Sequence, residues 1–521
     1  MRQRWVVVLA AGAVALLGAG CAQVTGSTGT PMPSTTPVST AAAAVPAAGG
    51  QVGSWGRAIK VPGLAALDKV GGASVESVSC SSAGNCGAGG DYWTHGRYLG
   101  FLVSERHGRW GQAIEVPGLG TLDAGAFPGD GGAGVSSLSC GSAGNCAAGG
   151  YYLDQNRNSQ GFVVSEKNGA WGQAIEVPGL AALNIGKDGR PGAGVTSVSC
   201  GSAGNCAAGG FYQDQYRHQQ GFVVSEKNGA WGRAIEVPGL GALNTGALVS
   251  EGAKVVSLSC ASAGNCAAGG YYSTRSAGGG LGQQAFVANE QNGRWQMAIE
   301  VPGIAVLNAG HYAEVSAVSC VSPGNCAAGG DAASRAPNLN GGGHQQAFVV
   351  SESNGVWGRA IEVPGLRALN THGDARVESV SCASPGNCAA GGNYDGDPAY
   401  GDGYGKGYVV SEKNGIWGDA VSAPGLQALH AGQYSDVKSV SCVSPGNCAA
   451  GGLYDASGSG QGFVVSEKNS AWRRASNLSG LRSLNKAGAA EVISVSCVPE
   501  GNCVAGGSYR DSHPHFQAFV T

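Results

Sequence analysis

Sixteen of the seventeen cysteines form eight Cys-x5-Cys pairs, a pattern whose chemistry is either disulfide formation or metal binding. The pairs bracket short turns such as Ser-Ala-Gly-Asn, and a hairpin of this kind brings two Cα atoms within bridging distance. No histidine or carboxylate recurs beside the pairs, which argues against zinc. An even number of cysteines in an exported chain predicts disulfides. The predicted bridges are Cys80–Cys86, Cys140–Cys146, Cys200–Cys206, Cys260–Cys266, Cys320–Cys326, Cys382–Cys388, Cys442–Cys448 and Cys497–Cys503.

Other residues that could do chemistry are scattered. His513 and His515 are the only close histidine pair, which is too little for a metal site. The segment 393–407 contains three aspartates that could cluster around calcium, but it lacks a glutamate at EF-hand spacing, so a plain acidic loop is the alternative. No Ser-His-Asp triad and no phosphate-binding glycine loop is recognisable. The sequence therefore predicts no cofactor, no metal ion and no enzymatic activity.

These cysteine pairs belong to a unit of about sixty residues that recurs along the chain. Each unit holds four strand-forming runs separated by turn residues, which we name A, B, C and D. In the unit that begins at Val195 they are residues 195–200, 206–211, 222–226 and 231–237. Asn-Gly between C and D is typical of a tight hairpin, and the Pro-Gly-Leu segment after D has room for at most one helical turn. Four antiparallel strands per unit are typical of a β-propeller blade.

The order of the runs at the two ends of the repeat region predicts a closed ring. The region opens with a D strand at residues 55–61 and stops with a C strand at residues 516–521. These two strands complete one blade between them, which gives eight blades and removes the free edges of an open array. Strands A and B are rich in small residues, whereas C and D carry Phe, Ile and Trp, as a blade that widens outward requires. The predicted fold class is an all-β, eight-bladed propeller.

The N-terminal fifty residues differ from the repeats. Arg2 and Arg4 followed by an apolar run to Leu17 are typical of an export signal, predicted over residues 1–20. The run Leu17-Gly-Ala-Gly-Cys21 resembles a bacterial lipoprotein lipobox, although its Leu lies one position too early; the resemblance implies lipidation of Cys21. Residues 21–50 are Ala, Thr, Ser, Pro, Gly and Val with almost no other type and no charge, so we predict a disordered tether ahead of a propeller at 51–521.

The hairpin run from Ser165 to Trp171 (Ser-Glu-Lys-Asn-Gly-x-Trp) resembles the Asp-box of bacterial propellers that include sialidases and Ycf48-like proteins, with Lys167 at the Asp position and one residue fewer. In that family the box is a structural turn, so the resemblance implies a fold and no activity. A sialidase site would need arginines, a tyrosine and acids converging on the axis. The recurrent Arg and Glu residues instead lie on strand D, where they predict a solvated rim: Arg57, Arg233, Arg359, Glu115, Glu176, Glu236, Glu300 and Glu362.

The units differ most in the B–C loops, which leave the blades on the same face as the D–A connections. Variable loops on a rigid frame are where recognition is usually located, although simple sequence drift is the alternative. Aromatic residues beside Gln, Asn, Asp and Arg could bind protein or stack on sugar. The candidate binding residues are Tyr151, Tyr152, Asp154, Arg157, Phe211, Tyr212, Asp214, Tyr216, Arg217, Tyr271, Tyr272 and Tyr394.

The sequence thus predicts a surface-displayed binding or scaffolding propeller whose ligand is a protein or a cell-envelope polysaccharide. A glycan-cleaving hydrolase and a purely structural envelope protein are the alternatives. Carboxylates within about 10 Å of one another in the axial mouth would favour the hydrolase. Net charge is −3 without charged blocks, which excludes a nucleic-acid-binding surface. We expect a monomer on the outer face of the cell membrane, held there only through the N-terminal lipid.

Overall fold

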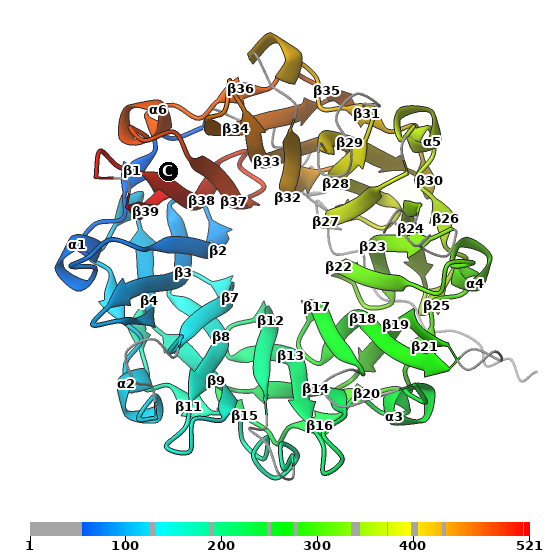
Figure 1. Ribbon diagram of the computed structural model, residues 1–521, viewed down its shortest axis with the longest axis horizontal. Helices are drawn as coiled ribbons and strands as arrows, with labels where there is room; N and C mark the ends of the chain where they lie inside the picture. Colours follow the sequence, from blue (N-terminus) through cyan, green and yellow to red (C-terminus); the bar gives the residue numbers. More distant parts are fainter. Residues whose placement is uncertain are drawn as a thin grey trace, which may run out of the picture. The chain divides into compact units, whose positions relative to one another are not determined.

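The computed structural model describes residues 55–125, 131–186, 192–246, 252–275, 280–334, 344–371, 373–396, 405–429, 434–513 and 515–521. In these residues each sequence unit folds into one antiparallel sheet with the strand order A, B, C, D. Eight such sheets surround a central axis, with the A strands nearest the axis (Figure 1). The predicted eight-bladed β-propeller is confirmed. We number the blades from one to eight in the order of their A strands.

The inner two strands of each blade are long. The A strands are β2 (Ser74–Ser82), β7 (Gly134–Ser142), β12 (Gly194–Ser202), β17 (Lys254–Ser262), β22 (Ala313–Ser322), β27 (Ala375–Ser384), β32 (Ser435–Ser444) and β37 (Ala490–Cys497). The B strands are β3 (Asn85–Thr94), β8 (Asn145–Leu153), β13 (Asn205–Gln213), β18 (Asn265–Arg275), β23 (Asn325–Ala333), β28 (Asn387–Asp395), β33 (Asn447–Asp455) and β38 (Cys503–Arg510).

The C strands are equally regular, whereas the D strands of blades one to seven are split into two short pieces and that of blade eight is the single piece β1. The C strands are β4 (Arg97–Arg106), β9 (Ser159–Lys167), β14 (Gln219–Lys227), β19 (Leu281–Gln291), β24 (Gln345–Ser353), β29 (Gly405–Lys413), β34 (Gly460–Lys468) and β39 (Phe516–Val520). The first D pieces are β5 (Arg109–Trp110), β10 (Ala170–Trp171), β15 (Ala230–Trp231), β20 (Arg294–Trp295), β25 (Val356–Trp357), β30 (Ile416–Trp417) and β35 (Ala471–Trp472). The second pieces are β1 (Ile59–Lys60), β6 (Ile114–Glu115), β11 (Ile175–Glu176), β16 (Ile235–Glu236), β21 (Ile299–Glu300), β26 (Ile361–Glu362), β31 (Val421–Ser422) and β36 (Ser476–Asn477).

At the split of strand D the chain is bonded to the neighbouring blade. In blade two, Trp171 pairs with Glu166 and Ile175 pairs with Val163, so one extra residue bulges out between the two pieces. The N–H of Ala174, at this bulge, donates to the carbonyl of Pro117 in the preceding blade at 2.7 Å. The equivalent bond recurs in every blade, with Ser479 as the acceptor for Ala58 in the last one. These bonds form an outer belt between blades.

In seven of the eight blades the segment after strand D makes a single turn of helix, within the predicted limit of one turn. These turns are α1 (Leu64–Leu67), α2 (Leu119–Leu122), α3 (Leu240–Leu243), α4 (Ile304–Leu307), α5 (Leu366–Leu369), α6 (Leu481–Leu484) and the 3-10 turn η1 (Leu426–Leu429). The glycine ahead of each α-turn has positive φ, for example 78° at Gly63, and the first residue of the turn is buried.

All eight predicted disulfides form, each within its own blade between A and B. The two cysteines are direct cross-strand partners, as Cys200 and Cys206 show. The Asn-Gly hairpin is also confirmed, because Asn168 and Gly169 both have positive φ, 51° and 81°. Gly169 N–H donates to the carbonyl of Gly144 in the A–B turn at 2.7 Å. The A–B and C–D turns therefore leave the blade on one face, and the B–C loops leave it on the other.

The two ends of the repeat region close the ring, as predicted. Strand β1 pairs antiparallel with β39, with Ile59 opposite Val520 and Lys60 opposite Phe519. Blade eight is thus built from the last three strands of the chain and the first one (Figure 1). Trp110 of blade one donates its indole N–H to the carbonyl of Thr521 at 3.0 Å, so the closing blade is also bonded to its neighbour.

A belt of serines ties the A strands together around the axis. The Ser-x-Ser-Cys run places two serine hydroxyls against the backbone of the next blade: Ser137 Oγ accepts from Val198 N–H and Ser139 Oγ from Cys200 N–H, both at 3.0 Å. The belt closes where Ser494 and Ser496 accept from Val78 and Cys80. One position lacks its serine, because Ala317 stands there and leaves Val380 N–H without this acceptor. The repeated serines are thus a structural requirement of the inner ring.

The Gly-Gly pair of strand B permits close packing beside the axis. A Cβ atom on Gly150 would lie 1.9 Å from the carbonyl oxygen of Gly134 on the adjacent strand, and one on Gly149 would lie 2.7 Å from Val195 of the next blade. Farther out, Phe162 and Leu180 are fully buried between blades. The predicted outward increase in side-chain size is confirmed. No helix among the described residues is long and apolar enough to cross a membrane.

Candidate functional site

The recurrent hairpin Ser-Glu-x-Asn-Gly-x-Trp links adjacent blades through side-chain hydrogen bonds. Trp231 donates its indole N–H to Ser165 Oγ of the preceding blade at 3.0 Å, and Ser165 Oγ donates to Glu226 at 2.7 Å. Glu226 is only 4% exposed, and its second carboxylate oxygen has no partner among the described residues. Burial raises the pKa of this carboxyl. The same orphaned oxygen and raised pKa recur at Glu105, Glu290, Glu352, Glu412 and Glu467.

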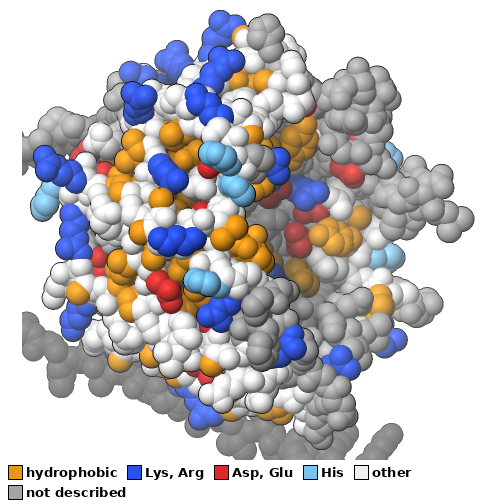
Figure 2. Space-filling model, turned by 60° about the vertical axis from the view of Figure 1, so that its left-hand side comes forward, with side chains coloured by type: hydrophobic (Ala, Val, Ile, Leu, Met, Phe, Trp, Pro, Cys, Tyr) orange, Lys and Arg blue, Asp and Glu red, His pale blue; other side chains and the backbone are white. Residues whose placement is uncertain are grey.

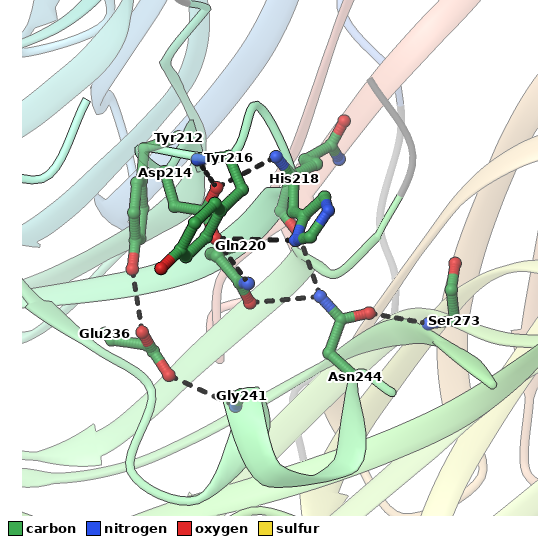
Figure 3. A network of polar contacts seen from close by, with 10 residues as sticks. Tyr212, Asp214, Tyr216, His218, Gln220, Glu236, Gly241, Asn244 and Ser273 are labelled. Carbon is green, nitrogen blue, oxygen red and sulfur yellow. Dashed lines mark hydrogen bonds and ion pairs between the residues drawn. The ribbon is translucent and has the colours of Figure 1, made fainter. Parts of the chain in front are cut away.

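The recurrent glutamates of strand D are half-buried or exposed, as expected of a rim, but four of them also accept a hydrogen bond from a strand-B tyrosine, which was not expected. The hydroxyl of Tyr152 donates to Glu176 at 3.0 Å, and that of Tyr212 donates to Glu236 at 2.9 Å (Figure 3). Glu115 and Glu300 accept the same bond from Tyr92 and Tyr272. Arg57, Arg233 and Arg359 are exposed, as expected of a rim.

The candidate residues Tyr152, Tyr212, Tyr272 and Tyr394 are buried, with 2%, 3%, 2% and 6% exposure. The first three of these tyrosines are held by the strand-D glutamates. Their side chains position strand B and are not presented on the surface of the loop.

Three B–C loops, in blades two, three and eight, are held by an aspartate at their start, which in blade eight is Asp511, the acceptor for the N–H groups of His513 and His515. In blade three Asp214 Oδ1 accepts from the backbone N–H groups of Tyr216 and His218 at 2.8 and 2.9 Å (Figure 3). Asp154 holds blade two in the same way. Arg157 and Arg217 adopt positive φ, 64° and 66°, at the equivalent turn position. Tyr216 is 65% exposed at the loop tip. These loops are therefore ordered by their own residues and present few large side chains to solvent.

The network in Figure 3 also links blade three to blade four. Asn244, which follows α3, donates to Gln220 at 3.0 Å and accepts from Ser273 N–H at 3.0 Å. Asn184 makes the same link between blades two and three. The ends of the B and C strands therefore keep a fixed position relative to the next blade.

The residues that differ most between blades lie at the axis, on the face of the B–C loops. They occupy the cross-strand pair between A and B that directly precedes the first Val of strand A, and the register places this pair at the same level in all eight blades. The pairs are Ser74–Asp91, Gly134–Tyr151, Gly194–Phe211, Lys254–Tyr271, Glu314–Asp331, Arg376–Asn393, Asp436–Leu453 and Glu491–Ser508. We call this region the axial mouth. It consists of these pairs and of one further residue in each blade, which directly follows the first Val of strand A.

That following residue is a β-bulge in every blade, because pairing shifts between the Val and the next paired residue, as at Val75 and Ser77. A bulge reorients its side chain relative to the regular strand. The bulge residues are Glu76, Ser136, Thr196, Val256, Ser316, Glu378, Lys438 and Ile493. They vary as much as the cross-strand pairs beside them.

One arc of the axial mouth, in blades two to four, is aromatic. Tyr151, Phe211 and Tyr271 are half-buried there at equivalent positions. Glycine opposite the first two leaves room for the rings, since a Cβ on Gly134 would lie 3.2 Å from the hydroxyl oxygen of Tyr151. The ammonium of Lys254 lies 5.3 Å from the centroid of the Phe211 ring, within the range of a cation–π contact.

The opposite arc, in blades five to seven, is charged. Glu314 and Asp331 are direct cross-strand partners, and Asp331 is only 3% exposed. Burial, followed by the charge of Glu314, raises the pKa of Asp331 to about 8. In blade seven, Asp436 pairs with Lys438 at 2.5 Å and accepts from the hydroxyl of Tyr434 at 3.2 Å. A hollow in which acidic, basic and hydrophobic side chains lie together is visible right of centre in Figure 2.

A cleft of about 370 Å³ adjoins the two arcs between blades four and five. Its lining is polar, and Gln283 in its wall donates to Glu314 of the axial mouth at 3.4 Å. Its residues include Gln219, Tyr271, Ser273, Gln283, His311 and Tyr312.

Metal binding finds no support in the part of the chain that the structure describes, where no three His, Cys, Asp or Glu residues are grouped to hold an ion. The calcium alternative falls mostly on residues 397–404, outside the described residues. The lipid-bearing Cys21, the export signal and the tether also lie outside them.

Sequence reasoning found the aromatic residues of the axial mouth but missed its charges. It located variation in the loops, whereas Glu314, Asp331 and Arg376 lie within strands. The signal was present in the sequence: the residues on either side of the first Val of strand A change from unit to unit, while that Val does not. The bulge that turns one of them could not be seen from the pattern alone.

No protein family model matches the chain, and no curated protein matches it in sequence. Among solved structures, Sqt1 from Chaetomium thermophilum bound to the N-terminus of the ribosomal protein L10 is 11% identical, with 87% of this chain and 98% of that chain covered and a TM-score of 0.46. The GH74 xyloglucanase from Xanthomonas campestris is 10% identical, with 87% and 60% covered and a TM-score of 0.41. The propeller domain of the Trilobed protease from Pyrococcus furiosus is 9% identical, with 74% and 95% covered and a TM-score of 0.39. They include both a glycosidase and a peptide-bound protein, and no activity is carried over from them.

Proposed function

We propose that this chain is a non-catalytic binding propeller whose ligand occupies the axial mouth on the face of the B–C loops. The proposal rests on a contrast within one chain. The disulfides, the turns and the bonds between blades repeat around the ring and form a uniform frame, whereas the eight cross-strand pairs at the axis all differ. Packing does not demand this variety, because the serine belt and the outer belt hold the blades together elsewhere. Rigid support below a variable surface is the usual design of a recognition site.

The axial mouth supplies the groups that binding needs. Tyr151, Phe211 and Tyr271 offer apolar area at low entropy cost, since each ring side chain has only two rotatable angles. The adjoining cleft between blades four and five adds amide, hydroxyl and imidazole groups. Polar groups placed around an apolar surface fix the orientation of a ligand.

The experiment is a screen of glycans and peptides against the wild-type chain and the triple variant Tyr151→Ala, Phe211→Ala, Tyr271→Ala. We expect a ligand bound by the wild type to lose at least tenfold in affinity with the variant, or about 1.4 kcal/mol. The matched control is Tyr216→Ala, which removes an exposed aromatic residue at a loop tip. Ligands retained by the triple variant at full affinity would contradict the proposal.

A glycan hydrolase is the second candidate, and the Glu314–Asp331 pair favours it. Directly opposed residues of an antiparallel pair lie within the carboxylate separations that glycosidases use. The two side chains, however, share one face of one sheet, whereas hydrolysis needs carboxyl groups that flank the bond to be cut. Release of reducing sugar from envelope polysaccharide, abolished by Glu314→Gln, would establish the hydrolase in place of the binding function.

For the setting of the protein, eight disulfides indicate an oxidising compartment. We extend the proposal to a lipoprotein on the outer face of the cell membrane, anchored through Cys21 and held off the surface by residues 21–50. Cys21→Ser should move the protein from the membrane to the soluble fraction on fractionation. A variant that stays membrane-bound to the same extent would contradict lipid anchoring without affecting the binding proposal.

A further inference from the structure

Asp331 is a buried carboxylate without a hydrogen-bond donor. It is 3% exposed, and none of the residues that the structure describes donates a hydrogen bond to it. Its direct cross-strand partner is Glu314, whose charge repels it. The charge of Arg376, in the next blade, lowers the pKa of Asp331. The Arg376 side chain, however, is 49% exposed and pairs with Glu378 at 3.8 Å. A carboxylate in this position gains from any cation brought to the axial mouth.

A second group of acids lies across the ring in blades eight and one. Glu76 follows Val75 on β2, Asp91 is the partner of Ser74, and Glu491 begins the last blade's contribution to the axial mouth. Burial, followed by the charge of Glu76, raises the pKa of Asp91 to about 7. Neither Lys nor Arg occupies an axial-mouth position in these two blades. The carboxylates here have no cation of their own at this level of the ring.

The whole axial mouth is therefore acidic. Its positions hold seven carboxylates and three cations: Glu76, Asp91, Glu314, Asp331, Glu378, Asp436 and Glu491 against Lys254, Arg376 and Lys438. The chain as a whole has a net charge of only −3, so the acids are concentrated at this place. A concentrated field of one sign attracts ligands of the opposite sign and repels anionic polymers.

The aromatic arc suits a cationic ligand as well. Lys254 already places its ammonium over the ring of Phe211, so a cation is accommodated on this surface. Burial lowers the pKa of Lys254, and the charge of Glu314 opposes that shift. Tyr151 and Tyr271, on either side of Phe211, carry rings at equivalent positions. Among the described residues no lysine lies over either of these two rings. A single chain crossing the axial mouth could therefore meet rings in one arc and carboxylates in the other.

We propose that the ligand of the axial mouth is a basic peptide segment, whose Lys or Arg side chains pair with the acids around Asp331 and Asp91 while other residues lie along Tyr151, Phe211 and Tyr271. This inference rests on the proposed binding function and names its ligand class. A peptide matches the arrangement because it carries several cationic groups on a backbone that spans two separated acidic groups. A neutral glycan would gain no charge pairing from these acids, and an anionic polymer would be repelled by those that are ionised.

The test is the binding of a labelled ten-residue peptide with four lysines alternating with Gly and Ser, followed by fluorescence anisotropy. A peptide with glutamate in place of each lysine is the ligand control. The mouth variant is Glu314→Gln with Asp331→Asn. It is expected to fold, because it removes repulsion between two neighbouring carboxylates. The matched variant is Asp419→Asn with Glu500→Gln, which removes the same charge from two exposed positions outside the axial mouth.

We expect the wild type and the matched variant to bind the lysine peptide equally, and the mouth variant to bind it at least tenfold more weakly. The glutamate peptide should not bind. Asp91→Asn, in the other acidic group, is an independent variant and should also weaken binding. Equal affinity of the wild type and both mouth-directed variants would overturn the inference. A neutral glycan that binds through the aromatic arc, with no binding of the lysine peptide, would overturn it too while leaving the proposed binding function intact.

The pH dependence gives a second readout. Asp331 faces Glu314, Arg376, Glu378 and Asp374, and its pKa of about 8 means that it loses its proton as the pH rises through that value. Asp91, which faces Glu76 and Tyr151, has a pKa of about 7 and loses its proton as the pH rises through that value. Affinity for the lysine peptide should therefore increase between pH 6 and pH 9 and decrease with added salt. Affinity that is flat over this pH range would contradict a role for these two carboxyls.

Discussion

The two ends of the A and B strands behave differently. At the disulfide end the blades are close copies, with a cysteine pair in each and an asparagine that holds the A–B turn, as Asn145 does by donating to Ser142 at 3.1 Å. At the axial mouth, on the same two strands, the eight cross-strand pairs all differ in composition. The comparison teaches that stability and recognition are separated along single strands. Substitutions among the repeated structural residues should therefore change the free energy of unfolding. Substitutions at the axial mouth and the loop tips should change it far less.

The closing strand should show the largest effect on stability. Deleting residues 51–63 removes the burial of Val61, the bond from Val61 to Ala518 and the bond from Ala58 to Ser479. We expect a loss of about 4 kcal/mol in the free energy of unfolding, from one buried apolar side chain and two backbone bonds. Deleting residues 24–45 is the control. Equal melting temperatures of the two truncations would show that the chain ends do not hold the ring closed.

The glycine pair of strand B should come next. Gly150→Ala forces a Cβ within 1.9 Å of the carbonyl oxygen of Gly134, so the backbone must move. We expect a loss of about 3 kcal/mol in urea unfolding. Gly172→Ala is the matched control, because its Cβ would meet only the carbonyl of Ser165 at 3.4 Å. A similar small effect at both positions would mean that the inner strands tolerate side chains.

The buried glutamates between blades should make stability fall as the pH rises. Burial raises the pKa of Glu105, Glu226, Glu290, Glu352, Glu412 and Glu467 in the folded state. Between the ordinary value and the raised value the folded chain binds more protons than the unfolded chain, so the free energy of unfolding decreases with pH across that window.

Unfolding measured from pH 4 to pH 8 should show this decrease, and Glu226→Gln should make it shallower by removing one of the six groups. Ser165 and Trp231 should keep their mutual bond in the variant. A pH profile that is unchanged by Glu226→Gln would assign the slope to other carboxyls.

The gap in the serine belt offers a smaller, stabilising change. Ala317→Ser would place a hydroxyl where seven other blades have one and give Val380 N–H an acceptor. We expect a gain of about 1 kcal/mol, and a loss of similar size for Ser257→Ala, which removes the acceptor of Val318 N–H. Differential scanning calorimetry of the two variants measures both. Destabilisation by Ala317→Ser would show that blade six is packed differently from the others.

The smallest effect is expected at a loop tip on the face of the B–C loops. Tyr216 is 65% exposed, and its loop is held by Asp214 through backbone bonds that do not involve the ring. Tyr216→Ala should change the free energy of unfolding by less than about 0.5 kcal/mol. A larger loss in urea unfolding would mean that this loop belongs to the frame and would weaken the separation between the two ends of the strands.

Much of the frame could be predicted because it repeats. The cysteine pairs, the Asn-Gly hairpins and the split blade at residues 55–61 and 516–521 are local patterns or a matter of strand order, and each was found in the structure. The roles of the recurrent polar residues could not be predicted. Glu176 lies on the rim as expected, but its bond to Tyr152 was not predicted, because only the finished sheet brings the B and D strands to that distance.

The sequence by itself determined the number of blades, their disulfides and the closure, because periodicity and the order of strands do not depend on atomic detail. Tertiary structure alone decided what surrounds the axis. Tyr151, Phe211 and Tyr271 were predicted as loop residues beside Tyr152, Tyr212 and Tyr272, yet alternation along the strand sends the first set toward the axial mouth and the second into the blades. Glu314 and Asp331 are seventeen positions apart in the chain and drew no attention there. They become neighbours because the A–B register places them directly opposite each other.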